Sequence, residues 1–388
     1  MSLQPQASRT VPRQTARIAR AALPKDNLYL QWRDELGFVF RDEDFAHLYS
    51  AEGQPALCPW RLAMVTVMQF VENLSDRQAA EAVRARIDWK YVLGLELTDV
   101  GFNHSVLCEF RERLVKGDVQ SLLLDRLLEH LGDKKLLKAR GRQRTDSTHV
   151  LACIRVMNRL ELVTETLRAA LNELATIAPD WLRRVAPASW YQRYHLRAEQ
   201  SRLPRGEQAR QQYAQTVGQD GFYLLSLVEQ EKQENEELNT LEKLVILRQV
   251  WERHFDHCDR PKDSELKAQP QKDGEGGEGG SPHSDAHASD AHAVVWRTNA
   301  ELPRAAHAVE SPYDAQARHS NKRDLSWTGY KVHLSETCDP TLPRLITQVH
   351  TTVATTQDVT CTSEIHQALA NKKLLPNLHL VDAGYRVM

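Results

Sequence analysis

Two aspartates in this sequence are associated with segments of strand character. Asp146 lies in the run T-D-S-T-H at 145–149, where β-branched and polar residues alternate, and Asp382 follows the short apolar run 378–381. A single aspartate of this kind is more often a capping or turn residue than a ligand. Two carboxylates on neighbouring strands, which lie about 4.8 Å apart, could instead share hard divalent cations such as Mg²⁺.

The chain between the two aspartates predicts the strands that would bring them together. Residues 327–336 and 342–355 both alternate and are separated by turn residues, which predicts an antiparallel pair. Residues 358–375 then have helical periodicity. With the intervening helical segment left out, the order is strand, strand, strand, helix, strand. A right-handed crossover would return the last strand beside the first, so we expect Asp146 on a buried central strand next to that of Asp382.

The residues before these strands predict a helical domain over 26–132. Pro59 suits the first turn of a helix, and Ser75 with Gln78 forms an S-x-x-Q capping box for the next one. Short helices with tight turns are typical of a helix-turn-helix unit, and a plain helical bundle has the same pattern. Residues 1–25, with five basic and no acidic side chains, are expected to be a flexible basic tail.

A long helical region separates the first predicted strand from the second. Residues 133–155 carry the basic run DKKLLKARGRQR into the first strand, and residues 156–269 are predicted to be a helical insertion that packs on itself. Residues 270–310 begin with glycines and a tandem SDAHA repeat, a composition too polar to offset the entropy of ordering, so we expect a flexible linker. Residues 311–388 hold the remaining strands.

The composition excludes several classes of protein. Lys and Arg number 50 against 52 Asp and Glu, so the chain is not a uniformly basic nucleic-acid binder. Mean hydropathy is −0.53, and no apolar run approaches the roughly 18 residues of a transmembrane helix, so we expect a soluble protein. The six cysteines contain no C-x-x-C pair, which disfavours a disulfide framework or a thiolate zinc site and agrees with a reducing cytoplasm.

Four segments in this order resemble a DDE transposase of bacterial insertion sequences. They are the run around Asp146, S-P-Y-D at 311–314, W-T-G-Y-K-V-H-L at 327–334 and V-D-A-G-Y at 381–385. The helical region before them resembles the family's N-terminal domain, and the helical insertion is the least specific part. The resemblance implies an α/β fold, in which an all-α domain precedes a ribonuclease-H-like mixed sheet. It implies an enzyme that cleaves DNA at transposon ends and joins them to target DNA.

The resemblance also implies roles for the two aspartates. Asp146 matches the first catalytic acid and Asp382 the second, and together they would hold two Mg²⁺ or Mn²⁺ ions for phosphoryl transfer. The family's third acid is a Glu on a later helix, whereas this chain ends six residues after Asp382. None of the nearest other acids matches that motif: Glu336, Asp339, Asp358 and Glu364. We therefore expect a C-terminally truncated transposase with an incomplete core and little or no activity; the alternative is a non-catalytic DNA-binding remnant.

The implied partners are element terminal repeats and target DNA, bound by a homo-oligomer without a membrane, in the bacterial cytoplasm at the nucleoid. Seven basic residues are candidates for phosphate contact: Arg84, Arg86, Lys90, Arg318, Lys322, Arg323 and Lys331. An ordinary solvated surface is an equally good interpretation of these charges, because acids are interleaved with several of them. A phosphohydrolase with Asp146 as nucleophile is a third hypothesis, disfavoured because no second acid lies close by in sequence.

Overall fold

The computed structural model describes residues 2–3, 10–201, 203–231, 236–258, 293–303, 307–322 and 325–385. The chain falls into two units. The first comprises residues 1–146, 334–349 and 361–388, and the second comprises residues 147–333 and 350–360. Arg323 and residues 270–292 of the expected linker lie outside the described residues.

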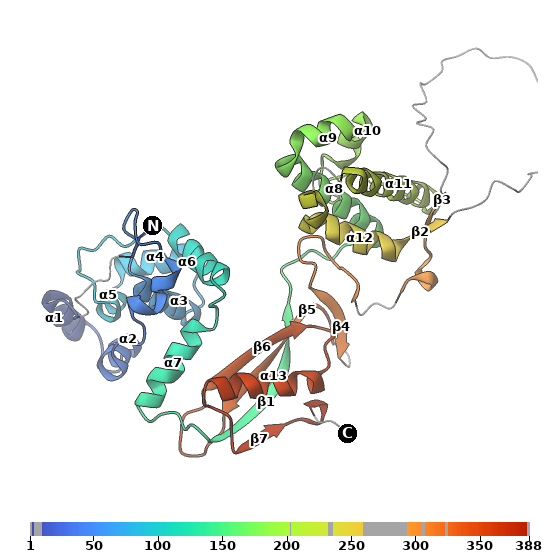
Figure 1. Ribbon diagram of the computed structural model, residues 1–388. Helices are drawn as coiled ribbons and strands as arrows, with labels where there is room; N and C mark the ends of the chain where they lie inside the picture. The colour runs from blue at the N-terminus through green and yellow to red at the C-terminus, as the bar shows by residue number, and fades with distance from the viewer. Residues whose placement is uncertain are drawn as a thin grey trace, which may run out of the picture. The chain divides into compact units, whose positions relative to one another are not determined.

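The N-terminal part of the first unit is helical (Figure 1). Its α-helices are α1 (Arg13–Ala22), α2 (Leu28–Gln31), α3 (Pro59–Val71), α4 (Asp76–Ala85), α5 (Ile87–Leu93), α6 (Ser105–Lys116) and α7 (Leu122–Asp133). A π-helical turn, η1 (Trp32–Leu36), and a 3-10 helix, η2 (Asp42–Leu48), join α2 to α3. The predicted capping box starts α4, with the Ser75 amide donating to Gln78 Oε1 at 2.9 Å. Phe45, Met68 and Trp89 are fully buried in the core of these helices.

Helix α1 corrects the expectation of a flexible tail over residues 1–25. Thr15 and Ala19 are completely buried, and the Thr15 hydroxyl donates to the Leu95 carbonyl at 2.9 Å. Leu30 and Tyr91 pack in the same small core. Arg13, Arg17 and Arg20 therefore stand on a helix whose other face is buried through Thr15 and Ala19.

The sheet has β1 near its centre. Its strands are β1 (Arg142–Leu151), β4 (Arg318–Lys322), β5 (Leu325–Thr337), β6 (Ile346–Val353) and β7 (Leu378–Val381), in the order β4-β5-β1-β7 with β6 also paired to β5. The sheet is mixed, because β4 and β5 are antiparallel whereas β1 and β7 are parallel. Helix α13 (Asp358–Asn371) connects β6 to β7 in the chain, and its Ile365 and Leu369 are buried against a core that includes Val381.

The second unit contains a group of helices with its own core. They are α8 (Arg159–Ile177), α9 (Pro179–Val185), α10 (Ala188–Tyr194), α11 (Glu207–Glu231) and α12 (Glu242–His254). Gly221 of α11 lies against Trp251 of α12, where an added Cβ would come within 2.2 Å of the indole. The short 3-10 helices are η3 (Glu236–Thr240), η4 (Asn299–Glu301) and, in the first unit, η6 (Ala383–Tyr385).

The sequence did not predict the antiparallel ribbon of β2 (Phe255–Cys258) and β3 (Ala293–Trp296). The local pattern continues the helical periodicity of α12 to Phe255, whereas that residue begins a strand whose partner lies far along the chain. Throughout the described ranges, none of the helices combines the length and the apolar composition required to cross a bilayer.

Candidate functional site

The register of β1 and β7 brings the two aspartates to equivalent positions. The last paired residues are Thr145 and Val381, so Asp146 and Asp382 each occupy the next position along two parallel neighbours. Both residues therefore lie just beyond the carboxyl end of the registered stretch, although β1 itself continues to Leu151. Both side chains are exposed. This corrects the expectation that Asp146 is buried: β1 is central, but its alternation buries Thr145 and turns Asp146 to solvent.

Local bonds fix the chain around Asp382. One oxygen of its carboxylate, Oδ1, accepts from the Gly384 amide at 2.9 Å. The next residue, Tyr385, is buried beside α13, and its carbonyl accepts from the Thr362 hydroxyl at 3.1 Å. Asp382 is thereby held by a short turn anchored to helix α13.

A row of polar contacts supports the strands on the face opposite Asp146. The Thr145 hydroxyl lies 2.6 Å from Ser335 Oγ and 2.7 Å from His379 Nε2, and His379 Nδ1 lies 2.8 Å from His366 Nε2. Burial, together with the nearby His366, lowers the pKa of His379, so its ring is neutral at pH 7. These contacts fasten β1 to β5, to β7 and to α13 one residue before Asp146. Sequence reasoning missed them; the signal was the polar residues at buried strand positions.

Ser147, on the other side of Asp146 along the strand, belongs to a second network. Asp358, the first residue of α13, accepts from Ser147 Oγ at 3.2 Å and from Lys331 Nζ at 2.9 Å. Burial alone would raise the pKa of Asp358, but the hydrogen bonds and charge of Lys331 outweigh it, so the pKa is lowered. Lys331 also donates to the Thr356 carbonyl at 2.7 Å. Lys331, a candidate for phosphate contact, is therefore engaged in holding α13.

This ion pair makes the stability of the second unit depend on pH. A carboxyl whose pKa is lowered on folding contributes stability above its unfolded pKa of about 3.9, and this contribution is lost as pH falls through the folded pKa. We expect Lys331→Met to lower the free energy of unfolding by about 3 kcal/mol at pH 7, because it leaves Asp358 buried without its cation. The difference in the free energy of unfolding between the variant and the wild type should become smaller below pH 4. Urea unfolding at neutral and at acid pH measures this difference and its pH dependence. A difference that is equal at all pH values contradicts the stabilising role of the ion pair.

Two of the other candidates for phosphate contact also bind groups within the protein. Arg86 forms ion pairs with Glu72 and Asp88, and its guanidinium lies over the rings of Tyr29 and Trp89. Lys90 is 3% exposed, and its ammonium donates to two backbone carbonyls of the following loop. Because its side chain is buried and its ammonium is bonded to these carbonyls, Lys90 does not reach a ligand in solvent. This corrects its assignment as a DNA contact.

The remaining candidates are more accessible. Arg84 is exposed and pairs with Glu81 at 3.3 Å, Lys322 is exposed at the end of β4, and Arg318 donates to the Ala317 carbonyl at 3.0 Å. Arg323 lies outside the described residues.

The strand carrying Asp146 supplies two basic side chains that the candidate list lacks. Arg142 and Arg144 are exposed at alternate positions of β1, on the same face as Asp146. Arg144 forms an ion pair with Glu336 of β5. The period-two alternation of the strand was the signal that could have found them.

The two aspartates fit part of a hard-cation site. Mg²⁺ binds proteins through one or two carboxylates and completes its octahedron with water and substrate phosphate oxygens. Within the part of the chain that the structure describes, no group of three or more His, Cys, Asp or Glu side chains is arranged around a common metal position. Asp146 and Asp382 would supply two carboxylates to such a site.

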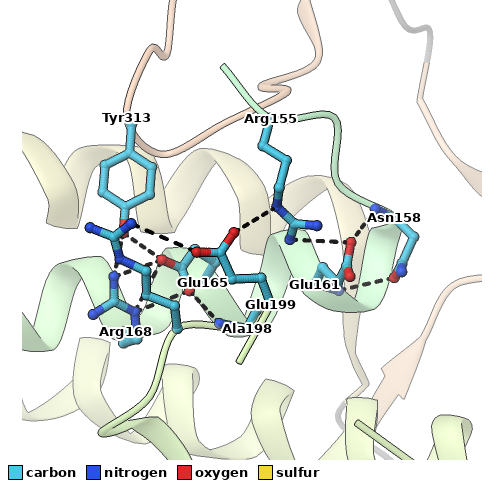
Figure 2. A network of polar contacts seen from close by, with 9 residues as sticks. Arg155, Asn158, Glu161, Glu165, Arg168, Ala198, Glu199 and Tyr313 are labelled. Carbon is cyan, nitrogen blue, oxygen red and sulfur yellow. Dashed lines mark hydrogen bonds and ion pairs between the residues drawn. The ribbon is translucent and has the colours of Figure 1, made fainter. Parts of the chain in front are cut away.

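Figure 2 shows a second polar cluster, in the second unit, centred on Glu165 of α8. Its carboxylate accepts from Arg168 Nη2 at 2.7 Å, from the Tyr313 hydroxyl at 2.5 Å and from the Ala198 amide at 2.9 Å. Burial alone would raise the pKa of Glu165, but these hydrogen bonds outweigh it and the pKa is lowered. The cluster therefore keeps a buried carboxylate charged and fully bonded.

The cluster borders a pocket of about 280 Å³. Arg155, at its rim, lies 3.4 Å from Glu161 and 3.5 Å from Glu199 (Figure 2). Because the charges of this pocket are paired with one another, the arrangement is that of a structural clasp between α8 and the segment that contains Tyr313.

Comparison with known proteins gives one match. Residues 17–113 match a family model described as a transposase domain (DUF772), and this stretch covers most of the chain from α1 to α6 and none of the sheet. The match supports a transposase family for this stretch of the chain. No curated protein and no solved structure matches the chain.

Proposed function

We propose that the chain is a DDE transposase in which Asp146 and Asp382 hold Mg²⁺ or Mn²⁺ for cleavage and strand transfer at the ends of a mobile element. One observation carries the proposal: the two aspartates follow the last registered pair of two parallel neighbouring strands. The transposase match over residues 17–113 supports the same assignment from an independent part of the chain.

The strand connections support a ribonuclease-H-like core. In this interpretation β6, β5 and β1 form the three-stranded meander, and α13 is the crossover that returns β7 beside β1. Helices α8 to α12 then form an insertion between the first and second strands of that core. In such a core Asp146 would lie on the central strand and Asp382 on the adjacent one.

The residues of the site have separate tasks. Bound metal ions would activate the attacking water or 3′-hydroxyl and stabilise the leaving oxygen. Asp146 and Asp382 would hold the ions, and the contacts of Thr145 on the opposite face keep β1 in register with β7. Arg142, exposed on the face of Asp146, attracts the DNA backbone to this side of the sheet.

The resemblance requires a third acid, which the described residues do not bring to Asp146 and Asp382. We therefore expect metal and DNA binding to be the direct readouts of this chain, and catalysis to depend on supply of that acid. A second candidate is a DNA-binding protein without chemistry; the confinement of the family match to the helical domain favours it. In either case we expect a homo-oligomer that acts on paired element ends at the nucleoid.

Coupling between metal and DNA tests the proposal. We expect Mn²⁺ to bind roughly tenfold more tightly in the presence of a duplex taken from the sequence flanking the gene, because phosphate oxygens complete its coordination; DNA affinity should rise by the same factor. Titration calorimetry of Mn²⁺, with and without duplex, measures this.

The variant Asp382→Asn provides the control. It should bind DNA in the absence of metal as the wild-type protein does, but without coupling to Mn²⁺. If the wild-type protein binds DNA but its affinity does not change with Mn²⁺, the catalytic proposal is contradicted. The second candidate, a DNA-binding protein without chemistry, then remains. No DNA binding at low salt contradicts both.

A further inference from the structure

A second, larger pocket lies in the second unit and shares no lining residue with the first. It measures about 650 Å³ and is bordered by the first residues of α8, the first residues of α11 and the segment that follows β3. Its charged lining consists of Arg159, Arg210, Arg297 and the exposed Glu207. Positive charge therefore prevails in a pocket that three separate segments of the chain form together.

Arg159 is held rigidly in the wall of this pocket. Its guanidinium donates to Asn299 Oδ1 at 2.6 Å and to the Arg297 carbonyl at 2.9 Å, and it lies 4.3 Å from the centre of the Trp296 ring. Its Nε donates to Nδ1 of the buried His254 at 3.3 Å. A cation fixed in this way keeps its charge in place before a ligand arrives.

His254, which accepts a hydrogen bond from Arg159, does not offset the positive charge of the pocket. Burial, and the neighbouring Arg159, Arg253 and Arg297, lower the pKa of His254 to about 3, so the ring is neutral at pH 7. Arg297 forms an ion pair with Asp256, which lies 3.5 Å from its guanidinium and is 57% exposed. The positive charge of the pocket is thus only partly compensated within the protein.

Two arginines of the pocket have side-chain N–H groups without a hydrogen-bond partner among the described residues. The Nε of Arg297 is buried and has no hydrogen-bond partner in the described part of the chain. Arg210 is exposed, and its side chain makes neither a hydrogen bond nor an ion pair with another described residue. The first turn of the 25-residue helix α11 also borders the pocket and adds the positive end of a helix dipole.

We propose that this arginine pocket binds a phosphate of the DNA backbone and makes the helices of the second unit a second DNA contact, separate from Asp146 and Asp382. The inference rests on the proposed function, since it takes DNA as the ligand. Arginine forks, an unpaired N–H and a helix start are the groups that bind phosphate oxygens. A free nucleotide phosphate has the same chemistry, so the test must separate the two sources.

The test reverses the charge of Arg210 in the full chain. We expect Arg210→Glu to weaken binding of a duplex from the gene-flanking sequence about tenfold and to reduce the salt dependence by about one phosphate contact. Fluorescence anisotropy over a series of salt concentrations measures both. The matched control is Arg184→Glu: Arg184 is an exposed arginine of α9 outside the pocket, so the change in net charge is the same. Its affinity should stay within about twofold of wild type.

The outcomes separate the inference from the proposed function. An equal loss of DNA affinity in both variants, or no loss in Arg210→Glu, overturns the assignment of the pocket as a DNA contact. Neither result contradicts DNA binding by the protein as a whole. Saturable binding of ATP that depends on Arg210, with unchanged DNA affinity, assigns the pocket to a free nucleotide and also overturns the inference. A wild-type chain that binds no DNA refutes the proposed function and the inference together. Circular dichroism should show that both variants are folded.

Discussion

Asparagine in place of Asp146 is expected to weaken Mn²⁺ binding by at least about 100-fold, because changes that only disturb the groups supporting a metal ligand already cost 10–100-fold. The substitution removes one of the two negative charges at the candidate site and leaves a neutral amide oxygen. The shape of the side chain is preserved, and Asp146 is exposed, so the fold of β1 should not change. Titration of the variant with Mn²⁺, followed by the electron paramagnetic resonance of free Mn²⁺, measures the affinity.

The matched control for this variant is Asp133→Asn, which makes the same chemical change at an exposed position at the end of α7. It should retain wild-type Mn²⁺ affinity, because a lone surface carboxylate does not form a site. If Asp146→Asn binds Mn²⁺ as tightly as Asp133→Asn does, Asp146 is not a metal ligand, and the placement of the two aspartates has another explanation.

Much of the local structure could be predicted because it depends on residues close together in sequence. The Ser75 and Gln78 pair specifies the start of α4, and the left-handed Gly94 ends α5 where the pattern stops. The parallel pairing of β1 with β7 could also be predicted, since a helix between two strands favours a parallel return. The pairing placed Asp146 and Asp382 side by side without any knowledge of their contacts.

Other features depend on contacts between distant residues and could not be predicted from local patterns. Lys90 looks like a surface cation in sequence, whereas two loop carbonyls draw it into the protein. The ribbon of β2 and β3 requires Phe255 to pair with Trp296 across a long connection. The hydrogen bond between His366 and His379 joins a helix to a strand, and neither residue has a neighbour in sequence that indicates it.

The buried face of β1 carries polar side chains. Gln143 donates to the Leu374 carbonyl at 2.7 Å and accepts from the Thr347 hydroxyl at 2.7 Å, and it is 1% exposed. Polar side chains thus occupy positions where a strand pattern leads one to expect apolar residues. Such a network has strict geometry, because every buried donor needs its acceptor. We infer that it fixes the register of β1, and hence the position of Asp146, more precisely than apolar packing would.

Loss of the Glu165 charge is expected to destabilise the second unit by about 3–5 kcal/mol, the cost of leaving its buried partner unpaired. In Glu165→Gln, the guanidinium of Arg168 stays only 11% exposed and loses its counter-ion, while the Tyr313 hydroxyl loses a charged acceptor. Tyr313 belongs to the segment that leads the chain back to β4, so its release also loosens the connection between the helices and the sheet strands. Urea unfolding, followed by the fluorescence of the buried Trp181, Trp190 and Trp251, measures the change.

The chain offers a control with the same chemistry at the surface. Asp180 and Arg183 of α9 also form an ion pair three residues apart, but their side chains are 84% and 78% exposed. Asp180→Asn should cost less than about 1 kcal/mol, since solvent and salt screen an exposed pair. The double variant Glu165→Met with Arg168→Met should recover part of the loss, because it removes the unpaired charge along with the acid. Equal effects of Glu165→Gln and Asp180→Asn would show that burial does not give the clasp its strength.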